Sequence, residues 1–124
     1  MHTDARGVVL EPVNREQLAL QRNAHLVITQ PGGIRGNHCH PRGSEVTVLL
    51  GPVLLRVRER GNVREFHVPA GKALRFTFPP GVAHAYQNTG TEPLAAMAFN
   101  TEVFDPAHPD TVREVLIPGP EAGS

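Results

Sequence analysis

The sequence predicts an all-β domain folded as a jelly roll or barrel. Short runs rich in valine, leucine, isoleucine, phenylalanine and threonine recur at intervals of about 8 to 12 residues, separated by many of the 12 glycines and 12 prolines. The chain has 124 residues, of which 40% are hydrophobic, enough to fill the single core of one domain. Many short strands in a domain of this size are typical of jelly rolls and barrels.

Turn residues set the limits of the expected strands. We place these strands at residues 8–13, 25–30, 36–40, 45–50, 53–60, 63–68, 73–77, 83–88 and 94–100. Gly61 and Asn62 supply the positive φ of a hairpin turn. Helix is expected over the short polar run 14–22 and as one turn over 109–114, with Asp110 as its cap. The domain is expected to occupy residues 1–117, followed by a flexible tail, 118–124.

Charge and hydropathy argue against several classes of partner. Lys and Arg number 12, as do Asp and Glu, so no net field attracts nucleic acid or an anionic membrane. No apolar run approaches the ~20 residues that span a bilayer, and the first residues lack a signal-peptide core. The single cysteine, Cys39, cannot form an internal disulfide. We therefore expect a cytoplasmic protein that binds neither nucleic acid nor membrane.

Three histidines and one glutamate indicate a metal site. His38 and His40 stand two residues apart in an expected strand, so side-chain alternation turns both to one face and Cys39 to the other. Their backbones are then roughly 7 Å apart, and both imidazoles can reach one ion at about 2.1 Å. Glu45, just after a turn, can close the coordination shell, and His84 supplies a third imidazole.

The spacing of these residues resembles the two motifs of the cupin superfamily. The first motif contains Gly32, His38, His40, Glu45 and Gly51, with one residue fewer than usual before Gly51. The second contains Pro79, Gly81, His84 and Asn88, with Gly71 two residues further upstream than the usual glycine. The resemblance implies a barrel of two packed sheets around one divalent metal ion, held by His38, His40, Glu45 and His84. Zinc or iron is expected, with nickel or manganese as alternatives, because imidazole suits several metals.

A narrower resemblance concerns residues 35–40, 100–106 and 109–111. These segments resemble the cupin modules of bacterial surface-polysaccharide biosynthesis, including the C-terminal domain of bifunctional capsular-polysaccharide enzymes. In those enzymes a zinc-holding cupin epimerises a nucleotide-linked 4-keto sugar and a reductase domain completes the reaction. Deoxysugar epimerases and ketoisomerases share the same barrel. The resemblance implies a metal-dependent isomerase or epimerase of a keto-sugar or similar small carbonyl substrate.

Such a reaction needs an acid and a base beside the metal. Tyr86 lies two residues beyond the ligand His84, so the strand period turns both toward the same interior. We take Tyr86 as the proton donor or acceptor and His84 as a catalytic metal ligand. A tyrosine that only packs, with its hydroxyl at the barrel mouth, is the alternative. The base is unassigned, with His25 and His67 as candidates.

Arginine supplies eleven of the twelve basic residues, and its planar guanidinium suits phosphate or carboxylate. Arg56 and Arg58 share one face of their strand. If this face lines the barrel, it can hold a diphosphate; if it faces water, it pairs with Glu59 and Glu65, which is the more usual arrangement. The candidate substrate-binding residues are Arg35, Arg56, Arg58, Arg75 and Asn100.

Two other functions remain open on the sequence alone. Histidines and a carboxylate with vacant coordination positions also suit a non-haem iron dioxygenase. A non-catalytic cupin that binds a sugar or another small molecule is the third alternative. In each case the partner is a small molecule. An unpaired strand edge invites association, so we also expect a homodimer, with residues 8–13 as an exchanged or added strand.

Overall fold

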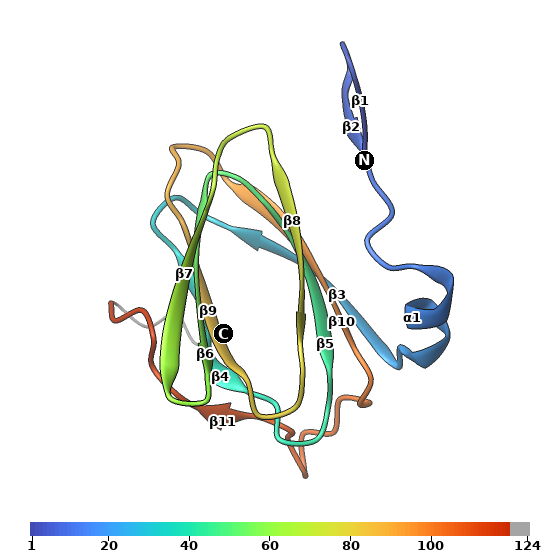
Figure 1. The fold of residues 1–124 in the computed structure, drawn as a ribbon, viewed down its shortest axis with the longest axis vertical. Coiled ribbons are helices and arrows are strands. Elements are labelled where there is room, and N and C mark those ends of the chain that lie inside the picture. Colours follow the sequence, from blue (N-terminus) through green and yellow to red (C-terminus); the bar gives the residue numbers. More distant parts are fainter. Residues whose placement is uncertain (120–124) are drawn as a thin grey trace.

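In the computed structural model, two antiparallel sheets face each other and form a barrel (Figure 1). One sheet has the strand order β3 (Asn23–Thr29), β10 (Leu94–Asn100), β5 (Glu45–Leu50) and β8 (Ala73–Phe78). The other has the order β11 (Val112–Arg113), β4 (Ile34–Cys39), β9 (Ala83–Asn88), β6 (Val53–Glu59) and β7 (Asn62–Val68). The structure describes residues 1–119, so residues 120–124 of the expected tail lie outside the described part. The all-β jelly-roll prediction is confirmed.

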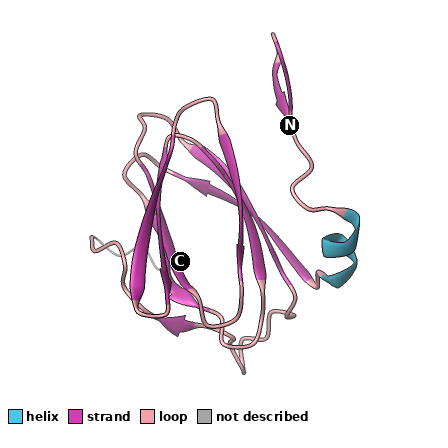
Figure 2. Cartoon of the chain, in the orientation of Figure 1, coloured by secondary structure: helices cyan, strands magenta, loops and turns pink. Residues whose placement is uncertain are grey.

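The N-terminal segment begins away from the barrel (Figure 1), although its Val13 packs against Val46 and Phe99 of the barrel. It contains a two-stranded hairpin, β1 (His2–Asp4) and β2 (Gly7–Val9), followed by the short helix α1 (Arg15–Leu20). A capping box starts this helix: the Gln17 N–H donates to Asn14 Oδ1 at 2.7 Å, and the Asn14 N–H donates to Gln17 Oε1 at 3.0 Å. Figure 2 shows this helix beside a molecule otherwise built of strands and loops.

The expected strands from residue 25 onward are confirmed, with small shifts at their ends. The expected strand 8–13 is wrong beyond Val9, because Pro12 lacks an N–H and Val13 is buried with Val46 and Phe99. The expected helical turn over 109–114 is also wrong. The Asp110 carboxylate accepts from the N–H groups of Arg42 and Gly43 instead of capping a helix, and β11 pairs with β4.

The hydrophobic core lies between the two sheets. Leu49 and Phe78 from the four-stranded sheet meet Leu55 and Val57 from the five-stranded sheet, and all four side chains are almost completely buried. Each contributes about 1.5–3 kcal/mol by leaving water. The same alternation of side chains also places the polar residues of the interior, because directly paired residues on neighbouring strands point to the same side of the sheet. Val57 pairs with His84, so the strand face that builds the core also carries His84 inward.

The last described segment covers the outside of the five-stranded sheet. Leu116 and Ile117 pack against Ala83 and Ala85 on the outward face of β9. The buried Asn37 side chain fastens this segment, since its Oδ1 accepts from the N–H groups of Leu116 (2.8 Å) and Ile117 (3.0 Å). The outer face of this sheet is therefore partly covered and does not belong to the barrel interior. Among residues 1–119, helix α1 is far too short to cross a bilayer, and the structure describes no other helix.

Candidate metal centre

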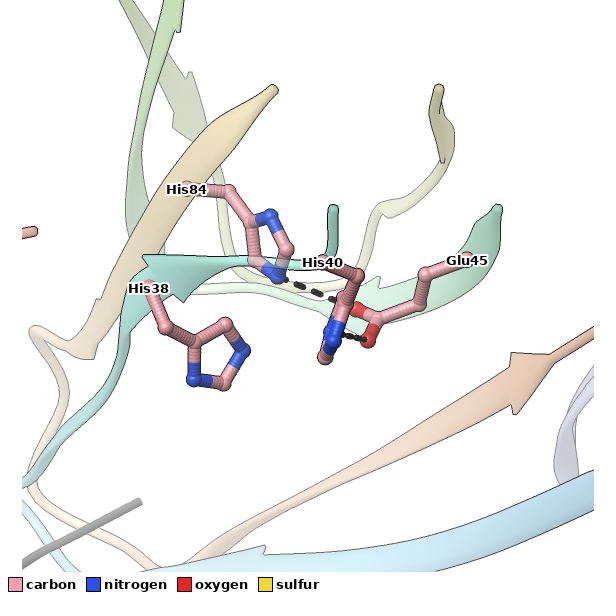
Figure 3. A group of neighbouring side chains, drawn as sticks. All are labelled: His38, His40, Glu45 and His84. Atoms are coloured by element: carbon pink, nitrogen blue, oxygen red, sulfur yellow. Dashed lines mark hydrogen bonds and ion pairs between the residues drawn. The ribbon is translucent and has the colours of Figure 1, made fainter. Parts of the chain in front are cut away.

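Four side chains converge at one end of the barrel interior (Figure 3). His38 belongs to β4, His40 follows it directly, Glu45 begins β5 and His84 lies in β9. One potential ligand atom from each residue lies within 4.8 Å of those of the others. The structure therefore brings together all four residues that the sequence predicts as metal ligands.

A β-bulge shapes the histidine side of this centre. The register of β4 against β9 shifts between Gly36 and His38, where Gly36 has φ 87° and Asn37 has φ 57°. Beyond the bulge, His38 pairs directly with His84, and their rings meet edge to face with centroids 4.8 Å apart. The His38 and His40 centroids are 4.7 Å apart, as expected for two imidazoles on one face.

Backbone carbonyls orient two of the imidazoles. His40 Nδ1 donates to the Asp110 carbonyl at 2.8 Å, and His84 Nδ1 donates to the Val82 carbonyl at 3.2 Å. With the Nδ1 atoms protonated in this way, the Nε2 atoms are the ones directed at Glu45. Metal-ligating histidines commonly make this kind of outer hydrogen bond, which fixes the tautomer and the ring orientation.

His84 shows most directly that the centre fits a cation. Its side chain is 3% exposed and stacks on Phe78 with centroids 3.9 Å apart. Its Nε2 lies 3.3 Å from Glu45 Oε2, yet it has no hydrogen-bond partner of suitable geometry among the described residues. A buried nitrogen of this kind is costly unless something binds it. A metal ion shared with Glu45, His38 and His40 would satisfy it.

The electrostatics of the centre favour an ionised carboxylate beside a protonated His40. Burial alone would raise the pKa of Glu45, but the hydrogen bonds from His40 and Thr47 and the nearby imidazole of His84 outweigh it and bring this pKa well below its ordinary range. Burial lowers the pKa of His40, but the hydrogen bond and charge of Glu45 dominate and raise it. His40 faces acceptors at both ring nitrogens, at 2.8 Å and 2.9 Å, which agrees with this direction.

The pKa of His38 shifts in the opposite direction from that of His40. Burial, followed by the neighbouring His84 and His40, lowers the pKa of His38 to about 4. This imidazole is therefore neutral at physiological pH and available as a ligand. Together, three imidazoles and one carboxylate form a donor set suited to zinc, iron or nickel.

The centre opens into a cavity of about 330 Å³ between the two sheets. Tyr86 and Arg35 line it from the five-stranded sheet, and His25 and Asn100 line it from the four-stranded sheet. The guanidinium of Arg35 donates to Thr29 Oγ1 at 3.2 Å and to the Ile28 carbonyl at 2.9 Å, so it is held in place. Four residues expected near the substrate therefore share one cavity with the metal ligands.

Other candidates lie away from this cavity. Arg56 binds Glu65 at 2.9 Å and the Leu116 carbonyl at 3.0 Å, on the outer face of the five-stranded sheet. Arg58 pairs with Glu114 at 2.7 Å on the same face. Of the two arrangements expected for these arginines, the structure has the one in which they face outward and form ion pairs. The inward positions of β6 are taken by core residues.

Arg75 and His67 also lie outside the cavity lining. Arg75 is exposed on β8, next to Val48 of β5. His67 is 73% exposed and contacts Glu65 at 3.0 Å, so His25 is the candidate base that the fold places at the cavity. The spacing of side chains along the strands cannot by itself tell which face of a strand points inward.

The sequence reasoning missed several residues of the cavity. Thr47 donates to Glu45 Oε2 at 2.6 Å and orients the carboxylate. Strand alternation from Glu45 was a signal that could have found it. Glu102, Asp105 and Asp110 line the cavity from the loop after β10, and no local pattern in the sequence places that loop over the metal ligands.

Two facing antiparallel sheets around three imidazoles and one carboxylate define a cupin, and this chain is a cupin. It belongs to the family described as the polysaccharide biosynthesis C-terminal domain, which matches residues 2–112.

Two bacterial proteins resemble the chain in sequence. It is 28% identical to the spore coat polysaccharide biosynthesis protein SpsL of Bacillus subtilis, over 90% of this chain and 81% of SpsL. It is 31% identical to the UDP-2-acetamido-2,6-beta-L-arabino-hexul-4-ose reductase of Pseudomonas aeruginosa, over 90% of this chain. The match covers only 30% of that reductase, so the chain corresponds to one part of a larger enzyme.

Solved structures show the same fold. The capsular polysaccharide assembling protein CapF of Staphylococcus aureus has a TM-score of 0.68 and 27% identity, over 93% of this chain and 34% of CapF. QdtA, a sugar 3,4-ketoisomerase from Thermoanaerobacterium thermosaccharolyticum, has a TM-score of 0.61 and 17% identity, over 76% of this chain and 67% of QdtA. At this identity, the likeness to QdtA concerns the fold.

Proposed function

We propose that this cupin is a metal-dependent isomerase or epimerase of a keto-sugar carried on a nucleotide. The observation that carries the proposal is the shared cavity: the four-ligand centre opens onto two groups able to move protons, Tyr86 and His25, on opposing sheets. The polysaccharide biosynthesis family, the polysaccharide role of SpsL and the UDP-linked sugar of the Pseudomonas reductase support a sugar as the substrate.

The residues that would hold the metal are His38, His40, Glu45 and His84. A bound divalent ion would polarise the substrate carbonyl and make the adjacent C–H more acidic. Thr47 and the carbonyls of Asp110 and Val82 keep the ligand side chains oriented. This orientation limits the rearrangement needed when an ion binds.

Tyr86 is suited to the role of proton donor. Burial raises the pKa of its phenol, and this outweighs the hydrogen bond to Thr29 and the charge of Arg35, which lower it. The hydroxyl therefore keeps its proton at neutral pH and can deliver it to a substrate carbon. His25 lies across the cavity on β3 and would take a proton from the other face of the same substrate. Epimerisation requires removal from one face and return to the other.

Arg35 and Asn100 are suited to binding the substrate. Two hydrogen bonds fix the Arg35 guanidinium, so it can meet a phosphate or a sugar oxygen with little loss of side-chain entropy. Asn100 is held by the Glu102 N–H, which donates to its Oδ1 at 2.9 Å. These two residues lie on opposite sheets and would contact a substrate from both sides.

Solvent exchange tests the proposed reaction. Purified protein is analysed for metal, loaded with zinc and incubated in D₂O with a panel of nucleotide-linked 4-keto sugars, and mass spectrometry follows the sugars. We expect deuterium next to the carbonyl and a loss of this exchange after chelation. No incorporation across the panel by metal-loaded protein would overturn the proposal.

The same samples separate the two alternative functions. Oxygen uptake by iron-loaded protein, with turnover only in air, would identify a dioxygenase. Saturable binding of a sugar without any product or exchange would identify a binding cupin. Exchange that continues unchanged under anaerobic conditions would exclude the first, and formation of an isomer would exclude the second.

A further inference from the structure

The turn between two proposed metal ligands is held by a segment distant in sequence. Residues 41–44 connect His40 to Glu45, and three successive N–H groups in this turn point toward the loop after β10. Arg42 N–H donates to Asp110 Oδ1 at 2.9 Å, Gly43 N–H donates to Asp110 Oδ2 at 2.7 Å, and Ser44 N–H donates to Thr101 Oγ1 at 3.0 Å. One carboxylate therefore satisfies two of the three donors.

Asp110 also reaches a ligand through its backbone. Its carbonyl accepts the Nδ1–H of His40 at 2.8 Å, so the same residue orients the imidazole and fixes the turn that follows it. The Asp110 side chain is 10% exposed, and the Arg42 guanidinium lies 3.7 Å from its Oδ1. A mostly buried carboxylate with two N–H donors is a strong and directional anchor.

The turn is built to let this carboxylate approach. A Cβ on Gly43 would collide with Asn100 Oδ1 and stand only 3.1 Å from Asp110 Oδ2. The absence of a side chain at this position allows the close packing between the turn and the loop. The distance between His40 and Glu45 thus depends on contacts made 67 and 68 residues further along the chain.

We propose that Asp110 is a positioning residue for the metal centre, which acts through His40 and the turn 41–44 and does not itself bind the metal. This inference rests on the proposed metal dependence. Outer partners of metal ligands commonly contribute about 10- to 100-fold in metal affinity. We assign a contribution of this size to Asp110.

Asp110→Asn and Asp110→Ala test the assignment, with Glu65→Gln as the matched control. Asparagine at position 110 keeps the backbone carbonyl and one acceptor oxygen. Its NH₂ group, however, is a donor and would face one of the two N–H donors of the turn. Glu65 is a carboxylate with two partners as well, Arg56 and His67, on the outer face of the sheet. We expect Zn²⁺ and Co²⁺ to bind about 10- to 100-fold more weakly to both Asp110 variants and unchanged to the Glu65 variant. Chelator competition measures the Kd.

A merely structural role would give a different result. If the contacts of Asp110 were the same with and without metal, its loss would lower the unfolding temperature of both forms equally and leave the Kd unchanged. The visible absorption of bound Co²⁺ gives a second readout, because its bands follow the ligand geometry. We expect altered bands in both Asp110 variants and wild-type bands in Glu65→Gln.

The outcomes distinguish this inference from the proposed function. Wild-type protein that binds neither Zn²⁺ nor Co²⁺ would overturn the metal dependence itself. Wild-type binding with an unchanged Kd and unchanged Co²⁺ bands in Asp110→Asn would overturn only the role of Asp110. If both Asp110 variants fail to fold, Thr101→Val decides, since it removes only the acceptor for Ser44 N–H. A Kd equal to that of the wild type would then refute the proposal, and a weaker one would support it.

Discussion

Nε2 of His84 lies 3.3 Å from Oε2 of Glu45, and this contact joins the two sheets of the barrel. His84 belongs to β9 of the five-stranded sheet, whereas Glu45 begins β5 of the four-stranded sheet. The ligand set is therefore assembled only when the two sheets have packed. A metal ion at this place would link them and stabilise the folded state.

Replacement of His84 should abolish tight metal binding. In His84→Ala the buried imidazole is lost together with the nitrogen that has no hydrogen-bond partner among the described residues. Because outer partners alone are worth about 10- to 100-fold, we expect the affinity for Zn²⁺ to fall by more than about 100-fold. Elemental analysis after dialysis measures this loss. His67→Ala, at an exposed position, is the control and should keep its metal. Equal metal content in the two variants would contradict the ligand assignment.

The ligand set shows what a sequence can predict. His38, His40 and Glu45 were predictable because strand alternation and short spacing are local properties, whereas His84, far along the chain, was assigned through the resemblance of its surroundings to the second cupin motif. Tyr86 followed from His84 by the same alternation. In β6, apolar residues alternate with Arg56 and Arg58, which favours an outward arginine face as observed, but the alternation alone left open a barrel lined by these arginines. That choice depends on which face meets the core.

Segments outside the regular strands were less predictable for a related reason. Asp110 was predicted to cap a helix because aspartate is a favoured residue at the N-cap of helices. Its carboxylate instead binds N–H groups of residues 42 and 43, a contact that exists only in the folded chain. Strand β1 was missed because its three residues, His2–Asp4, carry no apolar alternation. A long-range contact decides the case of Asp110, whereas β1 pairs with the neighbouring β2 in a local hairpin.

Metal affinity should depend on pH through His40. Although burial lowers the pKa of this imidazole, the hydrogen bond and charge of Glu45 raise it above the ordinary value in the metal-free protein. A metal must displace the Nε2 proton, so affinity is constant above that pKa and falls as pH drops below it. His38, with its pKa near 4, does not compete until more acidic conditions.

The expected slope is about a tenfold loss of Zn²⁺ affinity per pH unit below the His40 pKa, since one proton is released. Chelator competition between about pH 5 and 8 measures it, with the chelator's own protonation determined in parallel. Affinity that does not change over this range would show that His40 does not have to lose a proton, and would contradict its role as a ligand.

Tyr86 and His25 should have separable effects on the proposed reaction. If His25 removes the proton and Tyr86 returns one on the other face, Tyr86→Phe should still exchange deuterium through His25 but form about 10²- to 10⁴-fold less inverted product. His25→Asn should lose both exchange and inversion. Mass spectrometry and NMR of the sugar measure the two quantities, and metal analysis checks that the centre is intact. Unchanged inversion in Tyr86→Phe would leave this tyrosine only a packing role.

The chain is also expected to form a homodimer through its N-terminal segment. Every residue of β1 and β2 is exposed, with Val9 69% exposed, and the hairpin stands away from the barrel (Figure 1). Strand β3 is an edge of its sheet and presents exposed Leu26 and Ile28. Apolar residues on an edge strand and on a protruding hairpin suit association between copies. Light scattering at micromolar concentration should give the mass of two chains, and removal of residues 1–9 should give one. A monomeric full-length chain would refute this expectation.

Gly36 should be far less tolerant of a side chain than Gly61, although both have positive φ, 87° and 80°. A Cβ on Gly36 would lie 2.7 Å from the His84 carbonyl oxygen and 3.1 Å from Ala85 Cα, whereas a Cβ on Gly61 would meet nothing within 4 Å. Gly61→Ala therefore measures the backbone strain alone, roughly 1 kcal/mol or more. Gly36→Ala adds a collision with the backbone of β9, for which about 1–3 kcal/mol more is expected. Urea unfolding of the wild type and both variants, each freed of metal by a chelator, compares the two losses of unfolding free energy.

Because the collision separates β4 from β9 beside the His38–His84 pair, Gly36→Ala should also weaken Zn²⁺ binding, and Gly61→Ala should not. Equal destabilisation by the two substitutions would mean that β9 yields to the new side chain, and that the bulge does not fix the position of His38.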